Sequence, residues 1–481
     1  MKKQKIAVSM LVAGGLLSPL AYATNGMNLE GYGPVAAGMG GASMAYDNGT
    51  AAIMNNPATL GMMNEGSRVD IAVGGLFPKI TSNMPGMAGA DSSANAFYMP
   101  AMGYARKSGQ LTYGLGVFSQ GGMGTEYAWN SFMAAGSGEK VRSEVGVGRF
   151  IVPLAYNLND KVTIAGSVDY VWAGMDLKMA LSGQQFGDMI AAFGGSQKYG
   201  SASGSLVNTF GGAIGAAPGQ LTPPSATGGP INWARVDFSN SDNFTGEAKG
   251  GGFAGKLGAT FKATNSLTLG MTYHSKTAMS DLKSSGASMS MNVNVNGAPG
   301  PMTVPVSGSV AVHNFQWPMT FGFGGAYQVN DQFMLVADYK LIGWKDAMKD
   351  FSMTFTADAT QADASAAAFG MGGKSVDMTL NQNWDNQNVI EIGGAYKAND
   401  ALTLRGGLNL ANNPVPDTYM NPLFPAIAKS HVTGGFGYAF SKASTFDMSL
   451  VLTQKVSATN GSGVTTDFGG WGSQLLYSYR Y

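Results

Sequence analysis

The residues that could do chemistry are few and scattered in this chain of 481 residues. The absence of Cys excludes a thiolate zinc site and a cysteine nucleophile, and His274, His313 and His431 lack the spacing of metal ligands. No His, Ser and acid are arranged in a way that indicates a hydrolase. Residues 250–255 fit G-x-G-x-x-G, but no helical pattern follows them and glycine is abundant throughout. The sequence therefore predicts no enzyme, no cofactor and no metal site.

The composition combines little charge with little overall hydrophobicity. Charged residues make up 12% of the chain, about half of the usual share, and the mean hydropathy is 0.00. The 29 basic residues balance the 29 acidic residues, so a nucleic-acid partner is not expected. A β protein that faces lipid on one side has this composition, because apolar and polar residues alternate along each strand.

The first 23 residues have the pattern of a secretory signal peptide. Three Lys lie within residues 2–5, residues 6–17 form a short apolar core, and Ala21-Tyr22-Ala23 is an A-x-A cleavage site. We therefore expect residues 1–23 to be removed, so that the mature chain begins at Thr24. No later apolar run is long enough for a membrane-spanning helix.

Six segments share one pattern, in which an aromatic residue precedes a short polar turn and an alternating run. Asx side chains favour such turns, because they bond to their own backbone and tolerate left-handed geometry. Each segment is therefore predicted to be a β-hairpin. The segments are 104–118, 156–172, 261–275, 327–341, 396–410 and 438–452.

Alternation also assigns the two faces of the predicted strands. One face of 402–410 carries Leu402, Leu404, Leu408 and Leu410, and the other carries Thr403, Arg405 and Asn409. A basic side chain facing lipid at mid-membrane would cost about 2–4 kcal/mol, so the charged face must point into a lumen. The pattern indicates lipid outside and a partly polar lumen inside.

The alternating runs predict an all-β transmembrane antiparallel β-barrel over residues 67–481, with about 14 strands. Short turns alternate with long connections, as periplasmic turns and long extracellular loops do in bacterial outer-membrane barrels. We interpret the longest connection, 181–245, as an external lid or vestibule. The strands are predicted near 67–77, 96–107, 109–119, 143–157, 160–178, 246–262, 265–285, 305–329, 332–355, 385–398, 400–411, 429–440, 444–456 and 470–481.

Residues 24–66 do not alternate and are rich in Gly and Ala. A compact segment with little charge, placed ahead of a closed barrel, fits a plug in the lumen better than a periplasmic tail. Its order, GPVAAGMGGASMAYDNGTAAIMNNPATL, is similar to the N-terminal hatch of the FadL-type transporters of hydrocarbons and long-chain fatty acids. The residues that carry the resemblance are Gly40, Gly41, Ala42, Asn56, Pro57 and Ala58.

The resemblance implies passive transport of a hydrophobic molecule through a barrel that is gated by a hatch. It implies that the six residues just named act in gating and that the Asn-Pro-Ala triplet packs against a kinked strand. It also implies a ligand site near the mature N-terminus, at Thr24, Asn25, Gly26 and Met27. The expected partners are a fatty acid or hydrocarbon, outer-membrane lipids, lipopolysaccharide and the barrel assembly machinery.

The sequence leaves the cargo and two other functions open. A carboxylate ligand would favour an inward cation, yet no inward basic residue can be matched to a ligand residue of the family. Neutral aromatic or aliphatic hydrocarbons therefore remain alternatives to fatty acids. A general diffusion porin for polar solutes and a surface barrel used as an adhesin or receptor are the competing functions. The inward candidates are Arg149, Lys256, Lys340 and Arg405.

Overall fold

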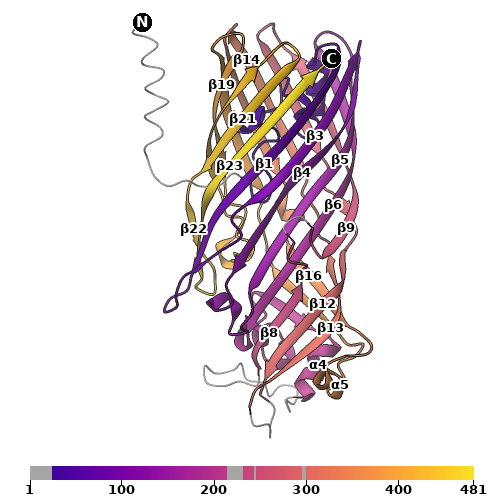
Figure 1. Cartoon of the computed structure of the whole chain (residues 1–481), viewed down its shortest axis with the longest axis vertical. Coiled ribbons are helices and arrows are strands. Elements are labelled where there is room, and N and C mark those ends of the chain that lie inside the picture. The colour runs from indigo at the N-terminus through magenta and orange to yellow at the C-terminus, as the bar shows by residue number, and fades with distance from the viewer. Residues whose placement is uncertain (1–23, 214–230, 243–244, 295–299) are drawn as a thin grey trace.

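The computed structural model describes residues 24–213, 231–242, 245–294 and 300–481, and the predicted signal peptide lies outside these ranges. Its strands form one closed antiparallel barrel, whose long axis is vertical in Figure 1. The predicted fold class is confirmed.

The strands vary from two to 21 residues in length. In chain order they are β1 (Gly66–Asn83), β2 (Ala90–Asp91), β3 (Phe97–Ser108), β4 (Leu111–Tyr127), β5 (Val141–Asn157), β6 (Val162–Ser182), β7 (Gly200–Ser203), β8 (Ile231–Phe238), β9 (Ala248–Lys262), β10 (Leu267–His274), β11 (Ala278–Met279), β12 (Leu282–Val293), β13 (Met302–His313), β14 (Thr320–Asn330), β15 (Phe333–Ile342), β16 (Asp350–Ala357), β17 (Ser375–Asn381), β18 (Gln387–Lys397), β19 (Leu402–Ala411), β20 (Ser430–Ala439), β21 (Ser444–Thr453), β22 (Val456–Thr459) and β23 (Thr465–Arg480).

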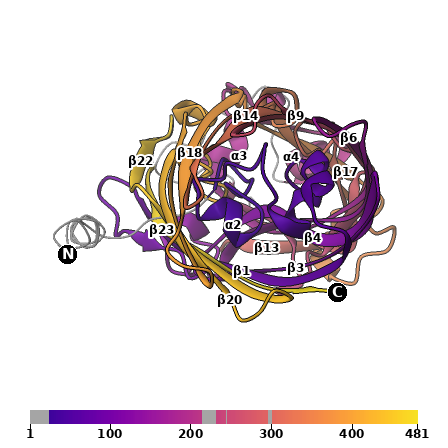
Figure 2. The same ribbon diagram turned by 90° about the horizontal axis from the view of Figure 1, so that it is seen from above.

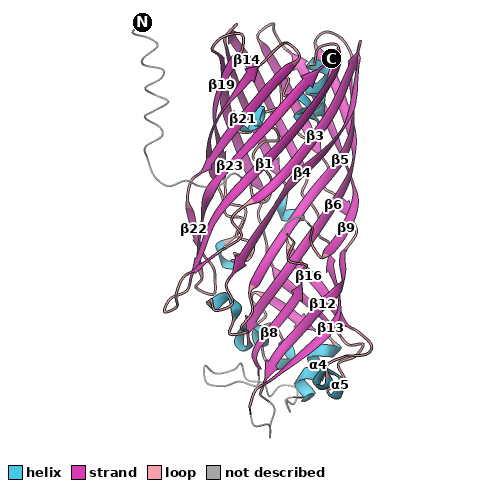
Figure 3. Cartoon of the chain, viewed as in Figure 1, coloured by secondary structure: helices cyan, strands magenta, loops and turns pink. Residues whose placement is uncertain are grey.

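The helices are short and gather in two places, inside the barrel and at the lower end of the view in Figure 3. Among the described residues, no helix is long and apolar enough to cross a membrane. The helices are α2 (Pro34–Ala37), η2 (Gly49–Ile53), η3 (Pro57–Met62), η4 (Phe132–Ala134), α3 (Gly183–Asp188), η5 (Ala191–Phe193), α4 (Ser205–Ala213), η6 (Trp344–Asp346), α5 (Ala364–Ala368) and η7 (Asp417–Tyr419).

The prediction of about 14 strands is wrong, because the barrel has 16. Some elements, such as β13 and β14, follow one another along the wall with a short break between them. Such a pair counts as one strand of the barrel. β7 and β8 both lie within the connection predicted as a lid or vestibule. β8 pairs with β6 and β12, and β7 pairs with β17, so this connection contributes to the wall.

The barrel closes by pairing its first strand with its last. β1 pairs with β23 from Arg68↔Arg480 to Asn83↔Thr465, and β1 also pairs with β3. All six predicted hairpins are present, as β3–β4, β5–β6, β9–β10, β14–β15, β18–β19 and β20–β21. Their turns lie together at one end of the barrel, which we call the turn end, and the opposite end is the loop end.

The outer surface of the wall is apolar, as the alternation predicts. On β19, Leu404 and Leu408 are 37% and 43% exposed, whereas Asn409 is fully buried. On the neighbouring β18, Ile390 and Ile392 point outward while Glu391 is buried. The polar face therefore points into the lumen, and it meets the segment that precedes β1.

Residues 24–65, which we call the inner segment, lie inside the ring of strands. Figure 2 shows α2 within this ring when the barrel is viewed along its axis. Nearly all residues of the inner segment are buried. The inner segment therefore fills much of the lumen on the side of the turn end.

Candidate functional site

The Gly-Gly-Ala motif of the inner segment is bound to the barrel wall by hydrogen bonds. The Gly40 N–H donates to Thr433 Oγ1 at 2.8 Å, and Asn409 Nδ2 donates to the Gly40 carbonyl at 3.0 Å. Lys340 Nζ donates to the Gly41 carbonyl at 3.2 Å. Ala42 is fully buried. Three strands, β15, β19 and β20, therefore hold the turn formed by the Gly-Gly-Ala motif.

Glycine in the wall lets the backbone of this turn come close. A Cβ atom on Gly407 would lie 2.4 Å from the Gly40 nitrogen, and one on Gly393 would lie 2.5 Å from the Met39 oxygen. Gly40 itself has φ +75°, a conformation that L side chains rarely adopt. The fit between the wall and the turn therefore requires glycine on both sides.

Asn56, Pro57 and Ala58 form the start of η3 and are all buried. The Asn56 side chain accepts from the Ala58 N–H at 3.1 Å, and its Nδ2 donates to the Met44 carbonyl at 2.8 Å. A Cβ atom on Gly258 of β9 would lie 2.2 Å from Asn56 Oδ1. The triplet thus packs against β9, and the implied contact with a kinked strand stays a prediction.

β4 has an irregularity, and the start of the inner segment contacts it there. β4 shifts register against β5 between Ser119 and Gly121. The Gly122 N–H donates to the Met27 carbonyl at 3.1 Å, and Asn28 forms an isolated bridge with Gly121. Met27, one of the residues predicted at the ligand site, therefore contacts the irregular part of β4.

Thr24, Asn25, Gly26 and Met27 are all buried in the middle of the lumen. The Thr24 N–H donates to His431 Nε2 at 3.1 Å. Gly26 has φ +65°, and a Cβ atom there would lie 2.9 Å from the Trp344 ring. These residues are held between the wall and a group of aromatic rings.

Three tryptophans form that group, which we call the Trp cluster. Trp317, Trp344 and Trp384 lie in the breaks between β13 and β14, β15 and β16, and β17 and β18. Their ring centroids are 5.7 and 5.2 Å apart in edge-on contacts, and all three are at most 1% exposed. Trp317 Nε1 donates to Asn28 Oδ1 at 2.6 Å. Pro318, which cannot donate to a ladder, is the sequence signal for the first break.

Toward the loop end, the inside of the barrel becomes apolar. A small cavity of about 20 Å³ lies beside Met27, among thioether and aromatic side chains. Methionine adapts its shape to different apolar neighbours, so this region suits a hydrophobic molecule. Its apolar lining consists of Met27, Val145, Met175, Leu177, Met179, Phe315, Met348, Phe351, Leu380 and Phe424.

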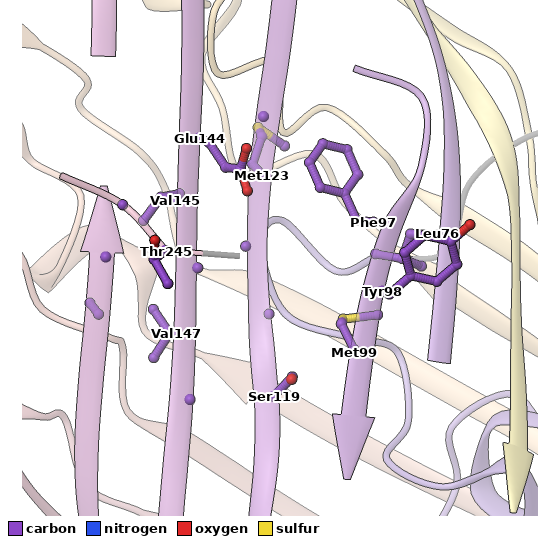
Figure 4. Close-up of a pocket in the computed structure, with 18 of the residues that line it drawn as sticks. Leu76, Phe97, Tyr98, Met99, Ser119, Met123, Glu144, Val145, Val147 and Thr245 are labelled. Carbon is purple, nitrogen blue, oxygen red and sulfur yellow. The ribbon is translucent and has the colours of Figure 1, made fainter. Parts of the chain in front are cut away.

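A larger cavity of about 800 Å³ passes through the wall between β3 and β4. The two strands pair only from Ala101↔Phe118 to Ser108↔Leu111, so their remaining parts diverge toward the loop end. Figure 4 shows Phe97 and Met99 on one side of the gap and Met123 on the other. We call this gap the side cavity.

The side cavity connects the interior with the lipid-facing surface. Its inner wall includes the buried residues Val145 and Val147, and its outer rim includes Tyr98 and Tyr170, which are 54% and 46% exposed. Thr24 of the inner segment also lines it. An apolar molecule inside the barrel could therefore leave without crossing the whole lumen.

Toward the turn end, the lumen is charged. Asp169 accepts from Arg149 Nη1 at 2.8 Å and also from Lys256 Nζ, and all three side chains are at most 1% exposed. Arg149, Lys256 and Lys340 all line a cavity of about 40 Å³. This cavity has room for only a few water molecules. Lys340 pairs with Glu391 at 2.9 Å.

All four inward basic residues considered for a carboxylate ligand have acidic partners. Besides the pairs of Arg149, Lys256 and Lys340, Arg405 Nη1 lies 2.8 Å from Asp447 Oδ1. Each cation is therefore already engaged by a carboxylate of the protein.

One further acid, Glu30, lies buried in the inner segment and was not singled out from the sequence. It is 1% exposed, and its Oε2 has no hydrogen-bond partner among the described residues. The pKa of Glu30 is raised to about 8, mainly by burial. The nearby Glu391 also raises it, while a backbone hydrogen bond and Lys340 lower it. Within the same described ranges, no group of three or more acids and histidines could hold a metal ion.

Solved structures resemble this barrel over nearly its whole length. The toluene transporter TodX of P. putida is 28% identical, with 94% of this chain and 99% of that chain covered and a TM-score of 0.78. The toluene transporter TbuX of Ralstonia pickettii is also 28% identical over the same shares, with a TM-score of 0.71. A FadL homologue of Pseudomonas aeruginosa shares the fold at 16% identity and a TM-score of 0.65, with 95% and 99% covered.

A curated relative from Chlorobium limicola is described as an uncharacterized protein in the 5′ region of the phosphoenolpyruvate carboxykinase gene. It is 51% identical over 82 residues, which are 17% of this chain and 39% of the relative. The match thus spans about two fifths of that relative's length.

A family described as "Outer membrane protein transport protein (OMPP1/FadL/TodX)" matches residues 16–474. This match covers most of the chain, and the barrel has the fold of the family's solved members. The protein is therefore a multi-pass β-barrel of the outer membrane and belongs to the OMPP1/FadL/TodX family of transport proteins.

Proposed function

We propose that this barrel carries small neutral hydrophobic molecules, such as monoaromatic hydrocarbons, passively across the outer leaflet of the outer membrane. The molecule enters from the loop end, which faces the exterior because the short turns of such barrels are periplasmic. It then passes the apolar region beside Met27 and leaves sideways through the side cavity. Flow down a concentration gradient needs no cofactor.

The observation that carries this proposal is the side cavity, which joins an apolar interior to the lipid-facing surface. An apolar molecule gains about 25 cal/mol for each Å² that it removes from water, so it favours an apolar route that ends in lipid. A route toward the turn end would bring it against the buried charges of Arg149, Asp169 and Lys256. Lateral exit is therefore the favoured direction.

Two features favour neutral cargo over long-chain fatty acids. The four inward cations are paired with acids of the protein, so a ligand carboxylate would have to displace one of these partners. The related TodX and TbuX, both 28% identical, are toluene transporters. Both features support a hydrocarbon as the cargo.

In this proposal the inner segment acts as the hatch. Gly40, Gly41 and Ala42 anchor it to the wall, and the triplet at 56–58 anchors it to β9. Thr24, Asn25, Gly26 and Met27 contact the cargo, because they lie between the Trp cluster and the side cavity. A molecule that enters must move these four residues aside.

Uptake by cells tests the cargo. A host that lacks its own transporter, once it expresses the protein, should take up radiolabelled toluene faster than the empty host, while the uptake of oleate stays unchanged. Faster oleate uptake with unchanged toluene uptake would overturn the neutral cargo. Proteoliposomes provide the second test: rapid swelling in small sugars would indicate a diffusion porin and contradict a closed hatch.

A further inference from the structure

Two lysines on the outer face of the wall lie directly opposite each other. Lys249 of β9 and Lys283 of β12 are register partners, and both are exposed. Neither ammonium group has a hydrogen-bond or ion-pair partner in the part of the chain that the structure describes. Like charges at directly opposed positions destabilise a sheet, so this pair favours an anion between them.

Two acids directly precede these strands and have other contacts. Asp281 Oδ2 lies 2.9 Å from His313 Nδ1, and Glu247 Oε1 accepts from the Ser284 hydroxyl at 3.1 Å. Neither acid forms a close ion pair with Lys249 or Lys283 among the described residues.

The level of the pair on the barrel identifies the source of that anion. The outward residues of β9 include Phe261, Leu257 and Phe253, which are 47%, 65% and 61% exposed. With a rise of about 3.3 Å per residue and a tilt of about 40°, Phe261 and Phe253 lie roughly 20 Å apart along the barrel axis, close to the height of an apolar band. Lys249 lies beyond this band on the side of the loop end.

An aromatic belt lies between the apolar band and the lysines. Tyr170 and Trp172 of β6 are exposed beside β9, as register partners of Phe253 and Gly251. Lys249 occupies the next outward position after Gly251, about 5 Å farther along the axis. Aromatic belts mark the membrane interface, so the lysines lie at the height of the lipid headgroups.

We propose that Lys249 and Lys283 bind a phosphate group of lipid A, the anionic anchor of lipopolysaccharide in the outer leaflet. The pair has the matching charge, faces the lipid and lies at the headgroup level on the outer side. Lys249 also lines the side cavity, so the bound lipid stands at its rim. This site is independent of which molecule the barrel carries.

Binding to lipid A in detergent tests the site. The double variant Lys249→Gln/Lys283→Gln should bind bisphosphorylated lipid A about tenfold more weakly than the unmodified protein, as read by native mass spectrometry. The variant Lys249→Arg/Lys283→Arg keeps both charges and should bind normally. Dephosphorylated lipid A should bind the unmodified protein as weakly as the Gln variant binds lipid A.

Lys161 and Lys262 provide a matched control at the turn end. Both are exposed, and the Lys262 N–H donates to the Lys161 carbonyl at 2.8 Å, so they are also neighbours. The double variant Lys161→Gln/Lys262→Gln should keep full affinity for lipid A. Equal weakening in both Gln variants, or equal binding of dephosphorylated lipid A, would overturn the proposal. If the Gln variant at 249 and 283 fails to fold, a second comparison still tests the proposal. It compares the binding of bisphosphorylated and dephosphorylated lipid A to the unmodified protein and to the Arg variant.

Discussion

The lumen toward the loop end is lined by Met175, Met179 and Phe351, whereas the lumen toward the turn end holds Arg149, Asp169 and Lys256. The first region has almost no polar atoms that need a partner, and the second is held together by buried ion pairs. The inner segment begins between them and fills the charged region. The side cavity opens where the apolar region ends.

This difference teaches how a barrel can be open to one molecule and closed to others. Water and ions meet a packed inner segment that is bonded to the wall through Gly40, Gly41 and Ser43. A hydrocarbon meets an apolar region with an exit into lipid before the charges begin. In the proposed function, selectivity depends on the boundary between these two regions.

The largest expected effect comes from removing the acid of the charged region. Asp169→Asn leaves Arg149 and Lys256 buried without a carboxylate, so the free energy of unfolding should fall by about 3–5 kcal/mol. Urea unfolding of the purified barrel measures it. Asp467→Asn is the control, because its pair with Lys455 is partly exposed, at 28% and 59%, and should be worth less than about 1 kcal/mol. Equal midpoints for both variants would contradict the buried pairing.

The next effect should come from placing charge in the apolar exit. Val147→Arg puts a cation on the inner wall of the side cavity, and hydrocarbon uptake should fall about tenfold because the cargo must pass a solvated charge. Val147→Leu keeps the site apolar and should leave uptake near normal. If both variants transport equally, while both are present as folded barrels, the route does not pass Val147.

A large side chain on the barrel wall should disturb the packing of the inner segment. Gly407→Leu places its Cβ 2.4 Å from the Gly40 nitrogen, and such overpacking costs about 1–3 kcal/mol. The segment should then loosen, and limited proteolysis should cut it faster. Gly406→Leu is the matched control, because the nearest atom to its Cβ is 3.9 Å away. The same cleavage rate in both variants would show that this contact does not hold the segment.

The smallest expected effect depends on pH. The pKa of Glu30 is raised from 4.5 to about 8 in the folded protein, so the folded state binds more protons than the unfolded state. Stability should therefore fall as the pH rises from 4.5, with the loss complete above about 8. Between pH 7 and pH 8 the loss should be about 1 kcal/mol.

Urea midpoints at pH 7 and pH 8 measure this loss. Glu30→Gln should reduce this loss, because its side chain then has no proton to lose. Glu65→Gln changes an exposed acid near the end of the same segment and should leave the loss unchanged. The same loss in Glu30→Gln as in the unmodified protein would assign the pH dependence to other groups.

The faces and hairpins of the barrel could be predicted from the sequence, because both depend on local patterns. The turns at Asn159, Asn330 and Asn399 form as predicted: each Asx side chain accepts backbone N–H groups two and three residues ahead. β7 and β8 could not be predicted, because β7 is only Gly-Ser-Ala-Ser and β8 lies within a long connection. Neither element has the hairpin partner that marked the predicted hairpins.

The candidate site was harder to predict, because it depends on breaks in the alternation. The Trp cluster lies in three interruptions of strands that the sequence predicted as continuous or omitted. The side cavity lies beside the register shift at Ser119–Gly121 and depends on the limited pairing of β3 with β4, which alternation does not predict. Asn56 packs closely against Gly258 of β9, although the two residues are far apart in the sequence. The alternation of apolar and polar residues does not predict such a contact.

The pairing of β1 with β23 has a consequence for the order of assembly. This seam joins residues more than 400 positions apart, such as Arg68 and Arg480, so the cylinder cannot shut until both strands are present. The inner segment lies within that cylinder. It must either be in place before the seam forms or thread in afterwards, and threading would be slow for a segment so closely fitted. We therefore expect the barrel to form around the inner segment, with the pairing of β1 and β23 as the last step.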